Sequence, residues 1–270
     1  MALNNPAFSR NPAFNSQGAV AAAQNVSAEQ LQEMYNQPAT LPDHEVMTVE
    51  TTLQKSVAGF GLLVVGAALG WLTVESLPFL WIGAGIVGFV LALVNIFKKE
   101  PSPALVLAYA GVQGVFVGGI SAWYETAFGG GIVAQAVIAT LVVVGVTLAL
   151  FASGKIRASK KATKIFLVAM VGYLVFSLVN FGLVLFGAVE SPWGVRGMEI
   201  MGIPLGIIIG VFVVIMAAYS LVLDFDFIQQ GVRNRAPRKY EWSGVFGIMV
   251  TVIWLYLEIL RMLAIAQSSD

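Results

Sequence analysis

From about residue 56 onwards, long runs of apolar residues alternate with short polar or charged links. Each run is close to the roughly 20 residues that a helix needs to cross the roughly 30 Å hydrocarbon layer of a bilayer. The runs are continuously apolar and show no strict alternation, so they predict helices rather than the strands of a membrane barrel. We expect seven spans, near Ser56–Val74, Phe79–Phe97, Pro103–Trp123, Gly131–Ala152, Thr163–Phe186, Gly202–Leu223 and Ser243–Ala266.

Residues 1–55 form a separate, polar segment. It opens with a repeated Asn-Pro-Ala-Phe, at Asn5–Phe8 and Asn11–Phe14, and continues in Ala, Gln, Ser and Asn. No basic stretch runs directly into an apolar one there, so we do not expect a cleavable signal peptide. The segment lacks the apolar residues that would offset its ordering entropy, and we expect a mobile polar tail. The sequence therefore predicts an all-α protein with a tail (1–55) and a seven-helix transmembrane domain in one bundle (56–270).

Composition agrees with this class. Of the 270 residues 58% are hydrophobic and only 11% are charged, against about 25% charged in soluble domains. Cysteine is absent, which excludes a disulfide scaffold, a zinc ribbon and a thiol nucleophile. Fifteen acidic and fifteen basic residues cancel, so no globally basic surface is available for nucleic acid. The first partner to expect is the lipid bilayer.

The basic residues indicate an orientation. The links after the first and third spans contain no basic residue, and the link after the fifth span contains only Arg196. The links after the second, fourth and sixth spans carry Lys98 and Lys99, then Lys155, Arg157, Lys160, Lys161 and Lys164, then Arg233, Arg235, Arg238 and Lys239. By the positive-inside rule these three links are cytoplasmic. The N-terminus is then expected in the cytoplasm and the C-terminus outside.

Small residues recur at spacings that place them on one helix face. Gly66–Gly70, Gly114–Gly118 and the series Gly202–Gly206–Gly210 predict close helix packing. We also expect a bend of the sixth span at Pro204.

Few ionisable residues fall within the apolar runs, and these are the first candidates for function. Asp224 and Asp226 end the sixth span, near the cytoplasmic edge of the membrane. Because they are two residues apart, they point about 200° apart around a helix, and one of them is expected to face the bundle. The spacing alone favours equally a gate that responds to protonation and an interfacial acid paired with the nearby basic link.

Glu258 and Arg261 lie within the seventh span, three residues apart on one face. They predict a mutually neutralising pair, with Arg261 reaching toward the outer surface. Glu258 is expected roughly 22 Å from the cytoplasmic start of its helix, so a direct Asp224–Glu258 pair is not predicted. In the third span, Tyr109 and Gln113 favour a helix–helix hydrogen bond over a polar path.

Several enzyme classes are excluded. The one histidine, His44, is in the tail, so a membrane Ser–His hydrolase would lack its base. No span carries a lysine near its middle for a retinal Schiff base, and no span carries the clustered ligands of a zinc protease. We expect a protein that is not an enzyme and has no cofactor.

The seven spans, the tail and three short segments resemble the Bax inhibitor-1 family (transmembrane Bax inhibitor motif). Asp224–Ile228 resembles the family's Asp-x-x-x-Ile segment. Gln113 and Gly114 resemble its glutamate–glycine pair, with Gln in place of Glu. LYLEILRML, at 255–263, resembles the closing helix of the family. The similarity covers residues 56–266, and the Asn-Pro repeats resemble a tailed bacterial subgroup, which implies the inner (plasma) membrane.

The resemblance implies a passive, pH-sensitive leak of Ca²⁺, in which two carboxylates near the cytoplasmic side share a proton and close the pore. Asp224 matches the first of them. The second is open: aligning LYLE places Glu258 there, whereas aligning the terminal Leu-Arg places Thr251 or Val252 there and leaves Asp226 as the nearby carboxylate. Ca²⁺ would be the permeant ion, with Asp224 and Asp226 as its transient ligands. The alternative is a non-transporting protein that modulates membrane partner proteins.

Overall fold

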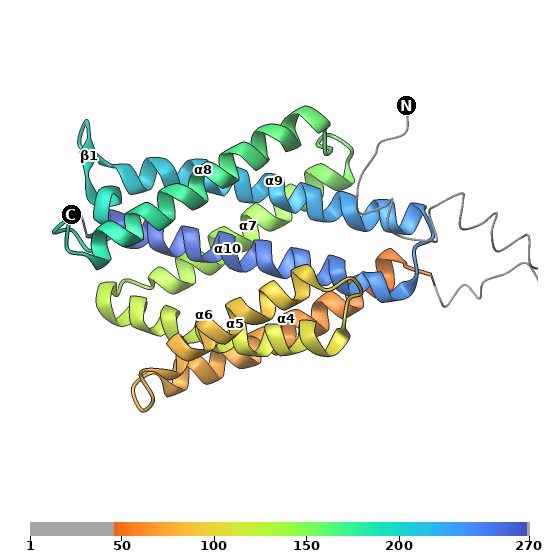
Figure 1. Cartoon of the computed structure of the whole chain (residues 1–270), viewed down its shortest axis with the longest axis horizontal. Helices are drawn as coiled ribbons and strands as arrows, with labels where there is room; N and C mark the ends of the chain where they lie inside the picture. The colour runs from red at the N-terminus through yellow and green to blue at the C-terminus, as the bar shows by residue number, and fades with distance from the viewer. Residues whose placement is uncertain (1–45, 269–270) are drawn as a thin grey trace, which may run out of the picture. The chain divides into compact units, whose positions relative to one another are not determined.

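The computed structural model describes residues 46–268, so residues 1–45 of the predicted mobile tail, including its Asn-Pro repeats, lie outside the described residues. Within 46–268, seven helices are long and apolar enough to span a membrane, which confirms the seven predicted spans and the all-α class. Figure 1 labels them α4 to α10. Their bounds are Val49–Thr73 (α4), Leu80–Phe97 (α5), Pro103–Phe128 (α6), Ile132–Ala152 (α7), Lys160–Leu185 (α8), Leu205–Arg233 (α9) and Glu241–Gln267 (α10).

α4 and α9 extend furthest beyond the predicted apolar runs. α4 begins seven residues before Ser56, because the Thr48 side chain caps it by accepting from the Thr51 backbone N–H. α9 continues ten residues beyond Leu223, through a mixed stretch in which the apolar Ile228 is buried against the bundle. Tertiary packing of this kind overrides the weak helix propensity of Asp, Phe and Gly. Asp224 and Asp226 therefore lie inside a helix instead of at its end, and Asp224 is about 14 Å before the last residue of α9.

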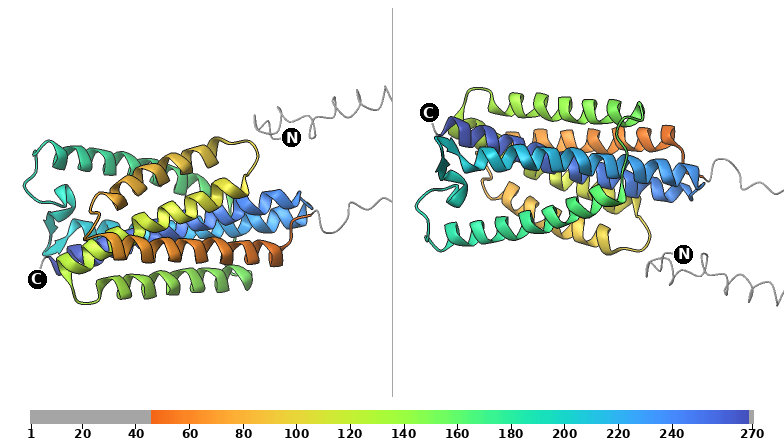
Figure 2. Two further views of the ribbon diagram at one scale, coloured as in Figure 1. Left: turned by 90° about the horizontal axis from the view of Figure 1, so that it is seen from below. Right: turned by 90° about the horizontal axis from the view of Figure 1, so that it is seen from above.

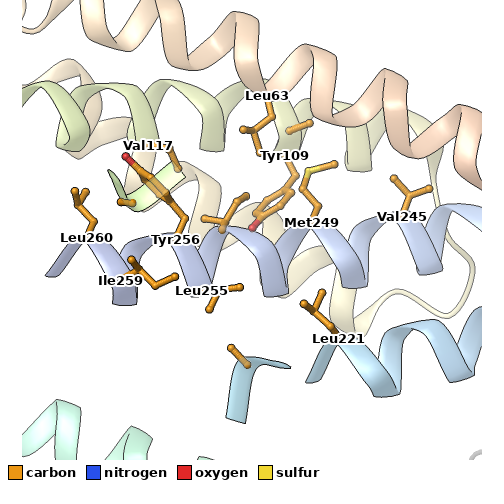
Figure 3. Packing of buried hydrophobic residues seen from close by; sticks show 14 of the residues in the cluster. Leu63, Tyr109, Val117, Leu221, Val245, Met249, Leu255, Tyr256, Ile259 and Leu260 are labelled. Atoms are coloured by element: carbon orange, nitrogen blue, oxygen red, sulfur yellow. The ribbon is translucent and has the colours of Figure 1, made fainter. Parts of the chain in front are cut away.

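α10, the last helix in the sequence, lies at the centre of the bundle. It packs against α4, α6, α7 and α9, and Figure 1 shows it running between the group α4–α6 and the pair α8 and α9. In the close view of Figure 3, Leu63 of α4, Val117 of α6 and Leu221 of α9 are directed toward it. By contrast α5 and α8 are peripheral, and nearly all their residues remain accessible from outside the bundle.

The glycines of α4 and α6 allow backbone-to-backbone contact, as predicted. A Cβ added at Gly66 would lie 2.4 Å from the Gly111 carbonyl oxygen, and one at Gly114 would lie 2.3 Å from that of Leu63. Real Cβ atoms do not approach backbone so closely, so these positions require glycine for the packing observed.

The predicted glycine series on the sixth span and the bend at Pro204 were wrong. Gly202, with a φ of +79°, lies in the turn of a short hairpin, β1 (Glu199–Ile200) and β2 (Ile203–Pro204), before α9 begins. Pro204 is the residue that precedes the helix. Proline lacks the N–H that an interior position needs and is favoured at helix starts. Of the three glycines in the series, only Gly206 and Gly210 are within α9.

The links α5–α6, α7–α8 and α9–α10 lie at one end of the bundle, and the C-terminal end of α10 lies at the other (Figure 1). We call the first the basic end, since these are the links in which the predicted cytoplasmic lysines and arginines are found.

Candidate functional site

Asp224 faces α10. Its Oδ2 accepts a hydrogen bond of 2.7 Å from the Thr251 hydroxyl, and a Cβ added at Gly247 would lie 2.8 Å from its Oδ1. The Ser220 hydroxyl lies 3.3 Å from that of Thr251. Three oxygen-bearing side chains thus meet between α9 and α10, at a point where glycine leaves room for a carboxylate. Ser220 was not predicted, although its position one turn before Asp224 is the available signal.

Asp226 contacts different neighbours. Its Oδ2 accepts a hydrogen bond of 2.5 Å from the Gln230 side chain. It also lines a hollow beside the first turn of α8, together with Lys160 and Lys164. This is the arrangement expected for two residues about 200° apart: Asp224 faces the bundle, and Asp226 faces the start of α8.

Glu258 and Arg261 form the predicted ion pair, but within a larger cluster. The Tyr173 hydroxyl and the Arg261 guanidinium both contact the Glu258 carboxylate. Arg261 also donates to the Tyr173 hydroxyl at 2.7 Å, as does Arg196 at 3.2 Å. Glu258 is buried. Its carboxylate is paired with Arg261 of the same helix and hydrogen-bonded by Tyr173 of α8, while Arg196 joins the cluster through Tyr173.

Arg196 was predicted only as a basic residue of an outer link, whereas the structure buries it. It lies in a short 3₁₀ helix, η3 (Gly194–Gly197), and is 6% exposed. It donates to Ser177 at 2.8 Å, and its guanidinium lies over the rings of Tyr173 and Phe176. The one available signal was that Arg196 is the only basic residue among the links opposite the basic end.

Asp224 and Glu258 have separate partners, in agreement with the expectation that they do not pair directly. Thr251, which one family match placed opposite Asp224, is the residue that contacts it. Thr251 and Glu258 are two turns apart on one face of α10, which corresponds to about 10 Å along the helix. Thr251, the partner of Asp224, and the charged cluster around Glu258 therefore lie at two depths on one face of α10.

The polar residues of the third span do not form the predicted hydrogen bond. The Gln113 Oε1 atom is buried against Gly88 of α5 and has no hydrogen-bond partner among residues 46–268. Tyr109 is buried and packs edge-on against Phe246 of α10, with ring centroids 5.1 Å apart. Close packing at these positions takes the place of the expected polar contact.

A third polar cluster, at the basic end, was not predicted. Glu241, the first residue of α10, is completely buried. Its carboxylate contacts the Lys55 ammonium at 2.5 Å, and accepts from the Thr48 backbone N–H at 3.1 Å and from the Thr51 hydroxyl. In addition the Met47 N–H donates to the Ala236 carbonyl at 2.8 Å. The start of α4 is thereby tied to the link that joins α9 and α10.

Among residues 46–268, no group of three or more His, Cys, Asp or Glu side chains is placed to hold a metal ion. Seven spanning helices with α10 at their centre, and carboxylates at two depths, define a polytopic α-helical membrane protein. The family described as Bax inhibitor 1 like matches residues 5–268, nearly the whole chain, and the protein belongs to this family. No curated protein matches the sequence.

Proposed function

We propose that this protein is a passive leak for Ca²⁺ or a related cation, gated by protonation of Asp224. The main observation behind the proposal is the position of that carboxylate. It lies between α9 and α10, accepts a hydrogen bond from Thr251 and is close to Ser220. Family membership supports the proposal, since the resemblance implies such a leak.

The chemistry of the three side chains suits a weak and transient cation site. Ca²⁺ takes oxygen ligands, and an ion that must pass through needs a site from which it can leave. One carboxylate and two hydroxyls supply oxygen and a single negative charge. Asp224 carries that charge only when deprotonated, so a proton removes the attraction for a divalent cation at this point.

The proposed gate has one carboxylate at its level instead of two. Thr251 occupies the facing position on α10 and donates a hydrogen bond where a second acid would share a proton. Asp226 contacts Gln230 instead. A single group should therefore give a pH response of one proton.

Flux of Ca²⁺ into liposomes containing the full chain tests the proposal. We expect flux to rise with pH as Asp224 deprotonates, and Asp224→Asn to abolish this dependence and leave a low, constant flux. Asp226→Asn is the matched control and should retain the pH response. If Asp224→Asn retains both the flux and its pH dependence, the gate is wrong. If the native chain shows no flux, the non-transporting alternative is favoured.

A further inference from the structure

A cavity of about 490 Å³ lies between α4, α6, α7 and α10, apart from the polar sites described above. Its volume is within the range of about 300–1,000 Å³ that is typical of ligand pockets. α4 and α7 pack on α6 and α10 and have little contact with each other. In both views of Figure 2, α7 lies at the outer edge of the bundle next to α4. The cavity therefore opens sideways, between these two helices.

None of the side chains that line the cavity carries a charge. Its three hydroxyls are already engaged within the protein. Ser121 donates to the Val117 carbonyl at 2.6 Å and lies 2.6 Å from the Tyr256 hydroxyl, and Thr140 donates to the Ala136 carbonyl at 2.7 Å. A polar ligand would lose its hydration there without gaining partners, so the walls favour a hydrocarbon occupant.

The mouth of the cavity faces the membrane. Val64 of α4 and Val137 and Leu141 of α7 line it, and all three are exposed on the outside of the bundle. These helices are two of the seven spans, so the medium outside the mouth is lipid acyl chains. Trp71 also lines the cavity, two residues before α4 ends. Tryptophan at such a position lies at headgroup level, where it meets the polar part of a lipid.

We propose that this cavity binds one acyl chain of a membrane phospholipid, which enters between α4 and α7 with its headgroup near Trp71. The chain would contact Val252, Ile253 and Tyr256 of α10. Figure 3 shows Tyr256 and Val117 lying together between α10 and α6, at the interior wall. The bound acyl chain would thus contact the same segment of α10 that carries Thr251 of the proposed gate and Glu258 of the charged cluster.

A photoreactive lipid tests the proposal independently of ion flux. The full chain is reconstituted into phosphatidylcholine–phosphatidylglycerol vesicles that include a phosphatidylcholine with a diazirine in one acyl chain, then irradiated, digested and mapped by mass spectrometry. We expect adducts on the interior residues Val117, Ser121, Ile253 and Tyr256, each less than one-tenth exposed. Adducts on outward residues such as Leu72 and Ile138 serve as the internal reference. Labelling confined to such outward residues would overturn the proposal.

Two variants at the mouth sharpen the test. Val137→Trp should fill the entrance and reduce interior adducts to the level found without irradiation. Val142→Trp, on the same helix but outside the cavity, should leave them unchanged. Ala68→Phe narrows the entrance from α4 and provides a second variant should Val137→Trp fail to fold. Interior labelling that persists in a folded entrance variant would show that acyl chains do not enter here.

Discussion

Among single residues, Glu258 has the clearest energetic role. It is 4% exposed and lies beside Tyr173, with the guanidinium of Arg261 on its carboxylate. A charge in a span is costly unless it is paired and hydrogen-bonded. The cluster meets that condition for Glu258, and it brings Arg196 into the same region through Tyr173.

Replacing Glu258 by Gln should therefore be strongly destabilising, because Arg261 would lose its counter-charge. Removing one partner of a buried pair typically costs about 3–5 kcal/mol of stability. Because Arg261 is partly exposed, we expect a loss near the lower end of that range. Thermal unfolding of the purified protein in detergent measures the effect. The double variant Glu258→Leu with Arg261→Leu should recover much of the loss. An unchanged midpoint for Glu258→Gln would contradict this account of the cluster.

At the scale of elements, the α4–α6 contact makes a sharp prediction. A Cβ at Gly118 would lie 1.9 Å from the Ala67 carbonyl oxygen. Gly118→Val should force the two helices apart and cost about 1–3 kcal/mol or more, as overpacking does. Gly61→Ala, on α4 but with nothing within 4 Å of the added atom, should leave the unfolding midpoint unchanged or slightly raised. Equal effects of the two variants would rule out the proposed contact.

The tie between α4 and α10 through Glu241 makes another prediction. Glu241→Gln should free the first turn of α4, because Lys55 and Thr51 lose the buried carboxylate that they contact. Amide hydrogen exchange over Val49–Lys55 should become faster. Glu100→Gln is the matched control, since its ion pair with Lys239 is exposed on both sides and such pairs contribute little. Equally slow exchange in both variants would contradict the tie.

The Glu100–Lys239 ion pair also gives a simple prediction for the pH dependence of stability. The Lys239 ammonium donates a hydrogen bond to Glu100 and keeps the pKa of that carboxyl below its ordinary value. A lowered pKa means that the small stabilisation is present at neutral pH and is lost as the pH falls through the lowered value.

The apolar runs were sufficient to predict the seven helices, because span length and composition are local properties of the chain. They were not sufficient to predict the polar clusters around Glu258 and Glu241. Tyr173, Arg196 and Glu258 come from α8, η3 and α10, and Glu241 meets Lys55 from almost 190 positions away. Such contacts depend on how helices pack, which spacing along one element does not specify. Gly202 was wrongly placed inside the sixth span, because the spacing of small residues does not show that its backbone adopts a left-handed φ.

For the whole molecule, the distribution of basic links predicts an orientation. The chain has no cysteine, so single cysteines can be introduced without a background. Ser153 in the α7–α8 link and Glu190 in the α8–α9 link are both exposed. In intact bacterial cells a membrane-impermeant maleimide should label Glu190→Cys, and should label Ser153→Cys only after permeabilisation. The reverse pattern would place the N-terminal end of α4 outside.

The central position of α10 also has a consequence for biosynthesis. Proteins are made from the N-terminus, so α4 to α9 leave the ribosome before the helix against which most of them pack. Until it arrives, the inward faces of α4, α6, α7 and α9 have only lipid or one another to contact. A nascent chain that ends before residue 241 should thus present membrane quality-control proteases with an incomplete assembly, and the bundle should be completed only once α10 has entered the membrane.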